Sequence, residues 1–563
     1  MSGGLRRRDM ITCRGGKAEL EAQYEDIGRL GHGGFGTVKR ARHRTTGLLR
    51  AVKTVRKAAD EDMPPDRGES WQVEEWVKIM AEVEALMELD HPNIVRLYEY
   101  YKDDHALYLV EELCSGGTLE QRLDEEGGRL SADDAAIALR QMLRGLLCCH
   151  AHGMAHRDLK PDNFVYATGS HDTSAALKMI DFGLSVHAAP SKGGPSPEKT
   201  YVKAAGTLEY TAPETLPRRD EATGELKREA TYTQAADMWS IGCIFYLLLT
   251  GEPLVDLERS RSSTAEFLRL VKSVVKGVER DLLDDVASKI RSEKFLAARL
   301  ALARRRAPPA ACELLEKMLV LEPQKRLTAA QALKDRFITD SYLAAPVLAK
   351  PGDFDADIVP KMRRYVEAPA LRRLAVMVEA HLLGPQDDEA VMRDVLTFRA
   401  ADRRGLGALR AADIAHALAS QGLDVPDDLD EILECIDLDQ NGAINLLEFQ
   451  AATMDPRLFC EPRLCRAAFR VLDADGDGFI TQADLEKVLM EGDGRSQMAR
   501  EILAEVETTA APPTGGHRGQ GGARAHPHGG RIDFARFCEV MLPKGVEPSL
   551  AARVAEYMGK SFV

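Results

Sequence analysis

The sequence predicts a multidomain chain in which a two-lobed α+β region is followed by an all-α region. At 563 residues the chain is too long for one hydrophobic core, so we expect two to four domains. In the first half a glycine-rich stretch, GHGGFGTV at 31–38, runs into an alternating, strand-like segment. The second half instead repeats a helix–loop–helix pattern.

Composition excludes several classes of protein. The net charge of −14 argues against a general nucleic-acid binder and suits acidic cation sites. Ten scattered cysteines without zinc-ligand spacing indicate reduced thiols in an intracellular protein. No apolar run approaches the roughly 20 residues of a membrane span, and the longest, at 241–249, predicts a buried core helix. Residue 2 is Ser2, which breaks the N-myristoylation pattern. We expect a monomeric cytoplasmic protein, with the nucleus left open.

The glycine-rich stretch predicts a phosphate-binding hairpin. Gly31, Gly33 and Gly36 give the pattern G-x-G-x-x-G-x-V, which is weak alone because glycine clusters usually mark turns. A dinucleotide fold would need a helix next, but an alternating stretch follows and ends in AVK, with Lys53. Glycines let backbone N–H groups approach phosphate oxygens, and a lysine on the next strand neutralises their charge.

Four further motifs follow in a fixed order. They are HRDLKPDN at 156–163, DFG at 181–183, APE at 212–214 and DMWSIG at 237–242. One of them alone can be chance, but the ordered set is specific. Residues 24–338 resemble the protein kinase superfamily.

The resemblance implies a catalytic role for each matching residue. Asp158 would orient the substrate hydroxyl, Lys160 would contact the transferring phosphate, as in serine/threonine kinases, and Asn163 and Asp181 would hold Mg²⁺. It also implies an ATP site made of Gly31, His32, Gly33, Gly34, Phe35, Gly36, Val38, Ala51, Lys53, Glu112, Asn163 and Asp181. Phosphoryl transfer depends on positioning and electrostatics, which these groups supply.

Lys53 would also pair with an acidic residue of the helix VEEWVKIMAEVEALMEL. We choose Glu82 for its spacing to the HPN turn at 91–93, with Glu84 as the competitor and a solvated helix face as the plain alternative. Glu214 would pair with Arg326 in a structural ion pair.

The kinase-like region departs from its family at three positions, Glu111, Thr118 and Asp162, the last standing where the family has Glu before Asn163. In the hinge segment 107–117, Glu111 stands where the family has Met, Thr or a bulky apolar residue, and a buried carboxylate is costly unless paired. Thr118 replaces the acidic residue of basophilic kinases, so a preference for substrate arginines is in doubt. The activation segment offers several possible phosphosites, although a polar loop explains them as well; they are Ser191, Ser196, Thr200 and Tyr201.

Two helix–loop–helix copies have calcium-loop spacing. In IDLDQNGAINLLEF the expected ligands are Asp437, Asp439, Asn441, the Ala443 carbonyl, Asn445 and Glu448, with Gly442 at the turn. In DADGDGFITQAD they are Asp473, Asp475, Asp477, the Phe479 carbonyl, Thr481 and Asp484. Because aspartate is one methylene shorter than glutamate, we predict weaker calcium binding by the loop that Asp484 closes. Ile444 and Ile480, at the eighth positions, should pair with neighbouring loops in short strands.

The other two copies have lost ligands. In the first, Arg404 and Leu406 replace oxygen donors, and Asp413 closes the loop that begins at Asp402. In the last, Arg536 occupies the closing position after the insertion 508–530, which we read as disordered. Its histidines could bind a transition metal, but we favour an adventitious low-complexity loop. Each helix–loop–helix copy is called a hand, numbered in chain order. We expect hands one and two to form one lobe, and hands three and four to form a second lobe.

This array resembles calmodulin, and a kinase followed by it resembles the calcium-dependent protein kinases of plants, algae and protists. The predicted boundaries are 1–23 (extension), 24–338 (kinase), 339–385 (junction), 386–546 (calmodulin-like) and 547–563 (tail). The junction is a basic amphipathic segment of the kind that calmodulin-like lobes bind, or else an ordinary linker helix.

The resemblance implies a Ser/Thr kinase that uses ATP, Mg²⁺ and Ca²⁺ and acts on protein substrates. The junction would block the kinase at low calcium, and the hands would capture it when calcium binds. Two alternatives stay open: a calcium-binding scaffold with a weak or inactive kinase, and a kinase whose hands are structural.

Overall fold

The computed structural model divides the chain into two units. The sheet–hand unit comprises Met1–Ala58, Arg96–Leu113 and Ala349–Val563, and the helical unit comprises Ala59–Val95 and Cys114–Leu348. The structure describes residues 10–11, 13–33, 36–56, 80, 82–169, 175–182, 185–187, 208–216, 218–219, 226–227, 233–256, 287–344, 355–489, 495–508 and 530–543.

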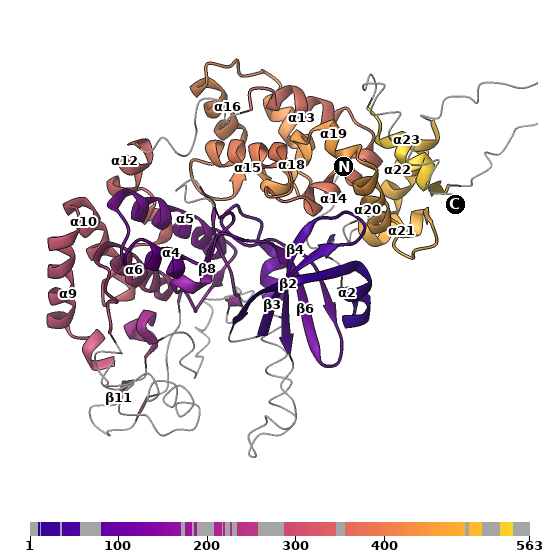
Figure 1. The fold of residues 1–563 in the computed structure, drawn as a ribbon. Helices are drawn as coiled ribbons and strands as arrows, with labels where there is room; N and C mark the ends of the chain where they lie inside the picture. Colours follow the sequence, from indigo (N-terminus) through magenta and orange to yellow (C-terminus); the bar gives the residue numbers. More distant parts are fainter. Residues whose placement is uncertain are drawn as a thin grey trace, which may run out of the picture. The chain divides into compact units, whose positions relative to one another are not determined.

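The sheet–hand unit begins with a six-stranded sheet in the order β1-β5-β6-β4-β3-β2 (Figure 1). Its strands are β1 (Cys13–Gly15), β2 (Tyr24–Gly33), β3 (Gly36–His43), β4 (Leu49–Arg56), β5 (Leu97–Lys102) and β6 (Ala106–Glu112). Only β1 is parallel to its neighbour, β5. β1 and helix α2 (Lys17–Gln23) come from the predicted extension 1–23, so part of that segment belongs to the sheet.

The sheet is most deeply buried at its centre. In β4, Arg50, Ala51, Val52 and Val55 are buried, and its neighbour β6 is buried along its whole length, as expected for a central strand. One small core on this sheet contains Leu20, Tyr24, Ala41, Val52, Tyr101, Ala106, Tyr108 and Val110.

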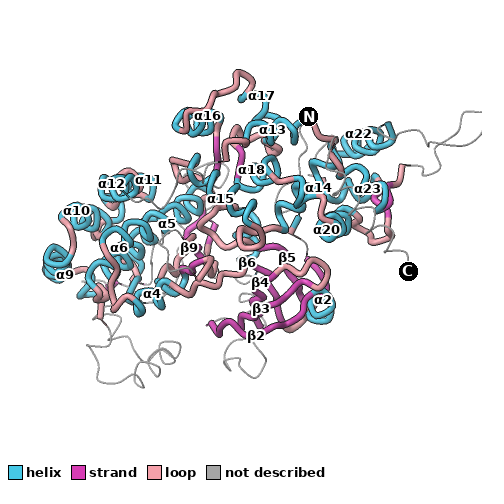
Figure 2. The backbone as a smooth tube through the Cα atoms, turned by 45° about the horizontal axis from the view of Figure 1, so that its top comes forward, coloured by secondary structure: helices cyan, strands magenta, loops and turns pink. Residues whose placement is uncertain are grey.

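The rest of this unit is helical (Figure 2). Its helices are α13 (Ile358–Val366), α14 (Ala370–Leu382), α15 (Glu389–Ala401), α16 (Ala411–Ser420), α17 (Leu429–Ile436), α18 (Leu446–Thr453), α19 (Pro456–Phe459), α20 (Pro462–Leu472), α21 (Gln482–Val488), α22 (Arg495–Thr508) and α23 (Phe534–Met541).

Short strand pairs join the helix–loop–helix copies in twos. β13 (Ala408–Leu409) pairs with β14 (Ile444–Asn445), and β15 (Phe479–Ile480) pairs with β16 (Ile532–Asp533). Ile444 faces Leu409, and Ile480 faces Ile532. The predicted pairing of hands one with two and three with four is therefore confirmed.

The helical unit is built around α5 (Ala132–Ala151) and α6 (Gln234–Thr250). Nearly all of α6 is buried, which confirms the core helix predicted for 241–249, and Gly251 ends it with φ 74°. Around them lie α4 (Leu119–Glu125), α9 (Glu293–Arg306), α10 (Pro309–Met318), α11 (Ala329–Ala332), α12 (Arg336–Ala344) and the strand pairs β7 (Met154–Ala155) with β10 (Val186–His187) and β8 (Phe164–Tyr166) with β9 (Leu177–Met179).

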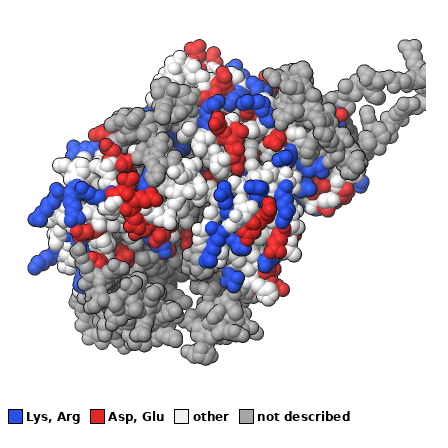
Figure 3. Space-filling model, in the orientation of Figure 1, with Lys and Arg blue, Asp and Glu red and all other residues white. Residues whose placement is uncertain are grey.

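Two surface properties bear on function. Among the described helices, none combines the length and apolar character that crossing a membrane requires. On the face drawn in Figure 3, the described lysines and arginines lie intermixed with aspartates and glutamates. That visible face therefore lacks, over its described residues, the continuous positive field that nucleic-acid binders present.

Candidate catalytic and calcium-binding sites

The HRDLKPDN segment forms a compact loop in the helical unit. Asp158 is buried, and the side chain of Asn163 donates to its carbonyl at 2.6 Å and to its carboxylate at 3.2 Å. Lys160 Nζ lies 3.2 Å from the same carboxylate. The structure thus brings together three residues predicted for catalysis: an acceptor for the substrate hydroxyl, a cation and an amide.

Asp237 holds this loop in place. It is completely buried, and its carboxylate accepts hydrogen bonds from the backbone N–H groups of His156 (3.0 Å) and Arg157 (2.9 Å) and contacts His150 Nε2 at 2.9 Å. Burial alone would raise the pKa of Asp237, but the hydrogen bonds from His150 and Arg157 lower it below its ordinary value. Arg157 has φ 73°, a conformation that needs such support. The sequence contained the signal, DMWSIG, but we assigned Asp237 no role.

Asp181 lies beside this loop. Its φ of 66° turns the chain sharply, and the N–H of Ile180 donates to the carbonyl of Asn163 at 2.9 Å. Phe182 is buried, with its ring 4.9 Å from that of His156. Gly183 and the four possible phosphosites lie outside the described residues.

The predicted structural ion pair is confirmed. Arg326 donates to both carboxylate oxygens of Glu214, at 2.8 and 3.1 Å. The Arg326 side chain is fully buried, and its guanidinium lies over the Trp239 ring. Such a bidentate pair anchors the APE segment to the core.

The phosphate-binding half of the predicted site lies on the sheet. Lys53 of β4 is opposite Val38 of β3 and Leu109 of β6, and Ala51 shares its face because side chains alternate along a strand. A Cβ at Gly36 would lie 1.7 Å from the carbonyl oxygen of Thr54, so only glycine fits there. Gly31, His32 and Gly33 end β2, whereas Gly34 and Phe35 lie outside the described residues.

Glu111 and Glu112 are both buried, but their side chains lie on opposite faces of the sheet. Glu111 is opposite Ala51 in the register and therefore shares the face of Lys53. Glu112 points to the other face, where its Oε2 accepts from the N–H of Arg96 at 3.4 Å.

Glu82 is buried in the helical residues 82–88 of the helical unit, and Glu84 is exposed. The burial of Glu82 rules out the solvated helix face that the sequence left open for it.

The Asp437 loop is folded around its own carboxylates. Asp437 accepts from the N–H of Gly442 at 2.7 Å, and Glu448 accepts from the N–H groups of Leu438 and Asn445, both at 2.9 Å. Carboxylate oxygens of Asp437, Asp439 and Glu448 lie within 4.8 Å of one another. Burial, with the nearby charges of Asp439 and Asp437, raises the pKa of Glu448 to about 8. A hard divalent cation would relieve this repulsion, so the donor set fits calcium.

The Asp473 loop has the same arrangement. Asp473 accepts from the N–H groups of Gly476 and Gly478, each at 3.0 Å. Oxygens of Asp473, Asp475 and Asp484 lie within 4.8 Å of one another. Asp484 is fully buried, and its Oδ1 has no hydrogen-bond partner among the described residues. An orphaned buried carboxylate oxygen at the closing position also fits a cation.

In each of the other two hands, an arginine forms a contact within the hand. Arg404 forms an ion pair of 2.7 Å with Asp413, so the third and twelfth loop positions bind each other. Asp402 accepts from the N–H groups of Leu406 and Gly407. In the last hand, Arg536 donates to the carbonyl of Val506 at 2.6 Å and thereby links the exiting helix to the entering one.

The junction forms part of the core of the hand domain, which comprises helices α15 to α23. Nine residues of α14 are buried, and the seven apolar ones, among them Leu371, Leu374 and Met377, share one hydrophobic cluster with the helices of all four hands. Arg372 donates to the carbonyls of Val540 and Leu542, both at 2.7 Å. The two lobes thus enclose α14.

Buried polar contacts join α14 and the following residues to the sheet. His381 Nε2 donates to the carbonyl of Tyr98 at 3.0 Å. Arg96 donates to the carbonyls of Ala380 (3.2 Å) and Leu383 (3.1 Å) and to Gln450 Oε1 (2.7 Å). Sequence reasoning missed these contacts; the only local signal was an arginine beside an apolar strand.

Comparisons with known proteins extend across both halves. The protein kinase domain family matches residues 24–338, an EF-hand domain pair matches 390–454, and an EF hand matches 466–490. The chain is 30% identical to calcium-dependent protein kinase 34 of Arabidopsis thaliana, over 94% of this chain and 86% of that protein. It is 28% identical to calcium-dependent protein kinase 5 of Plasmodium falciparum, over 87% of this chain and 75% of that protein.

Proposed function

Because the chain belongs to the calcium-dependent protein kinase family, we propose that calcium binding at its two intact loops switches on phosphate transfer from ATP to protein serine or threonine. At low calcium the 339–385 junction blocks the kinase. When calcium binds to the Asp437 and Asp473 loops, the hands hold the junction and free the substrate site.

The catalytic residues act by positioning and charge. The Asp158 carboxylate accepts the hydrogen bond of the attacking hydroxyl, and Asn163 and Lys160 fix its direction. Lys160 also places a positive charge beside the transferring phosphate, and Lys53 binds the phosphates of ATP from the sheet. Mg²⁺, held by Asn163 and Asp181, would neutralise phosphate charge.

One observation carries the regulatory proposal: the hand domain encloses α14. This helix presents apolar residues on most of its surface, with Leu371, Ala375 and Phe449 of α18 all fully buried in the shared cluster. A free α14 would expose this surface to water, at roughly 25 cal/mol per Å². Calcium shifts the balance to the extent that it binds more tightly to the hands in the state that holds α14.

Kinase assays at two calcium levels test this proposal. The full-length protein is given ATP, magnesium and a basic serine peptide, with excess calcium or excess chelator. Activity only with calcium supports the switch. Equal activity in both conditions would make the hands structural, and no activity in either, with calcium still bound, would favour a scaffold.

Loop variants assign the response to each site. Glu448→Gln and Asp473→Ala should each raise the calcium concentration needed for activation. Asp424→Ala, an exposed acidic residue outside the loops, is the matched control and should leave it unchanged. Two sites predict a shallow titration, and a Hill coefficient clearly above two would contradict this site count.

A further inference from the structure

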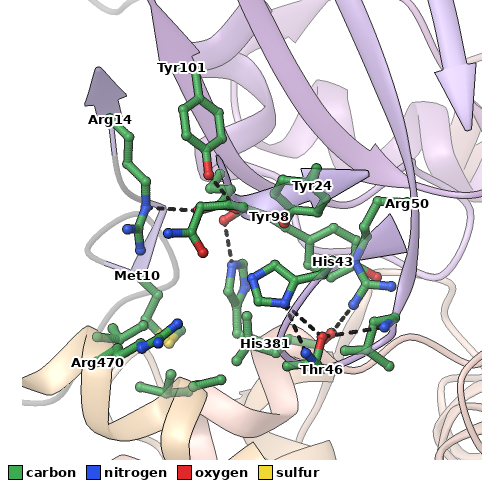
Figure 4. Close-up of a pocket in the computed structure, with 17 residues that line it drawn as sticks. Met10, Arg14, Tyr24, His43, Thr46, Arg50, Tyr98, Tyr101, His381 and Arg470 are labelled. Carbon is green, nitrogen blue, oxygen red and sulfur yellow. Dashed lines mark hydrogen bonds and ion pairs between the residues drawn. The ribbon is translucent and has the colours of Figure 1, made fainter. Parts of the chain in front are cut away.

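A cavity of about 120 Å³ lies within the sheet–hand unit, between the sheet, α14 and α20 (Figure 4). Its volume equals that of about four water molecules at liquid density. The predicted catalytic and calcium-binding residues do not line it. Instead it is lined by strands, by the C-terminal part of α14 and by the helix that leads into the Asp473 loop.

The lining is rich in positive charge. Arg14, Arg50 and Arg470 approach the cavity from three different elements (Figure 4). The Arg14 charge is balanced by Glu99, with Nε 2.9 Å from Oε2, and the Arg50 charge by Asp387 at 3.2 Å.

Arg470 is the surplus charge. It donates to Thr45 Oγ1 at 3.2 Å and forms no ion pair with any residue that the structure describes. Arg14 also lies 3.9 Å from Glu19, so Arg470, which is exposed, is the one arginine of the three without a carboxylate partner among the described residues.

The remaining polar groups also suit an anion. The carboxylate of Glu99, which also lines the cavity, accepts hydrogen bonds from the hydroxyls of Tyr24 (2.6 Å) and Tyr101 (3.2 Å) and pairs with Arg14. Nδ1 of His43 accepts from the N–H of Thr46 at 3.1 Å, which leaves its Nε2–H as a donor. Burial, and to a lesser degree the charges of Arg50, Arg470 and Arg14, lower the pKa of His43 to about 4, so its ring is neutral near pH 7.

We propose that this cavity binds a small tetrahedral oxyanion of the phosphate or sulfate class, with Arg470 as its main charged contact. Its size admits such an ion, Arg470 offers a charge that no described carboxylate balances, and His43 adds a neutral donor. The bound anion would connect the sheet to α14 and α20, and so to the helix that precedes Asp473. The proposal is independent of the calcium switch.

Calorimetric titration of the full-length protein with sodium sulfate tests the site. Saturating ADP and magnesium occupy the nucleotide site. Calcium can also be added, because calcium sulfate stays soluble at millimolar concentrations. We expect one site with a dissociation constant below a few millimolar. Arg470→Ala should weaken binding at least tenfold, and Arg470→Lys should weaken it less because the charge remains.

Arg463→Ala is the control, since Arg463 is exposed on the same helix but does not line the cavity. Unchanged sulfate affinity in Arg470→Ala, equal losses in Arg463→Ala, or no binding to the parent protein would each overturn the proposal. Titrations with phosphate, at low calcium, and with acetate define the anion class. Phosphate should bind like sulfate, and equally tight acetate binding would replace the tetrahedral oxyanion with a carboxylate.

Discussion

Arg50 and Asp387 form an ion pair of 3.2 Å across 337 positions of sequence, with side chains that are only 3% and 5% exposed. Arg50 also donates to the carbonyls of Leu49 and Leu382, and its guanidinium lies 4.0 Å from the centre of the Tyr98 ring. The pair therefore connects the kinase sheet to the residues that follow the junction helix.

Removing one partner of this ion pair should destabilise the folded protein. Asp387→Ala leaves the Arg50 charge buried without its carboxylate, and we expect a loss of about 3–5 kcal/mol in the free energy of unfolding. Denaturant unfolding measures it, with Asp424→Ala as the exposed control. The double variant Arg50→Met with Asp387→Leu should recover much of the loss. A single variant as stable as the parent would show that water reaches the pair.

The residues that close the two calcium loops make a reciprocal prediction. Asp484→Glu should tighten calcium binding at the Asp473 loop, and Glu448→Asp should weaken it at the Asp437 loop, each by roughly tenfold, because bidentate closure needs the longer side chain. Calcium calorimetry on the full-length protein resolves the two sites. If Asp484→Glu binds calcium no better than the parent, the length of the closing residue does not set the affinity.

Asp237 should matter for catalysis without touching the substrate. Asp237→Asn replaces a carboxylate that accepts from two backbone N–H groups of the catalytic loop. A loss of about 1–3 kcal/mol in this support corresponds to a fall in kcat of roughly 5- to 150-fold. Steady-state assays should show KM for ATP much less affected than kcat. The control is Glu313→Gln, which removes only an exposed ion pair with Arg336.

Asp394 of α15 predicts a pH dependence of stability. Burial, partly opposed by Lys361 at 3.8 Å and reinforced by Asp355, raises its pKa to about 7. The folded state therefore holds a proton between about pH 4 and 7 that the unfolded state has released, so this group makes stability fall as pH rises through that window. Above pH 7 its contribution levels off.

Asp394→Asn should remove this penalty. We expect the variant to gain on the order of 1–3 kcal/mol over the parent at pH 8 and to match it near pH 4. Denaturant unfolding across this range gives the comparison, with Asp424→Asn as the control. Parallel stability curves for parent and variant would show that Asp394 is ionised in the folded protein at all these pH values.

The parts of the fold that sequence predicted are those with local or motif-spaced signals. Ile444 and Ile480 were expected in paired strands because the eighth position of a hand has a fixed place, and the register agrees. Arg326 and Glu214 were expected together because both belong to known kinase motifs.

The rest depended on contacts between distant segments. No spacing rule connects Arg96 to Gln450, or Arg50 to Asp387, because their partners are fixed by how the hand domain packs on the sheet. The parallel pairing of β1 with β5 was missed for the same reason, since a three-residue strand has no periodicity to detect.

The ion pair between Arg404 and Asp413 affects how the first lobe responds to calcium. In that hand the positive charge is part of the polypeptide, so it is present at every calcium concentration and cannot be removed by a chelator. Its strand partner, the hand closed by Glu448, must take its charge from solution. We therefore expect the first lobe to bind a single calcium ion, so that its calcium threshold reflects one affinity rather than two sites that assist each other.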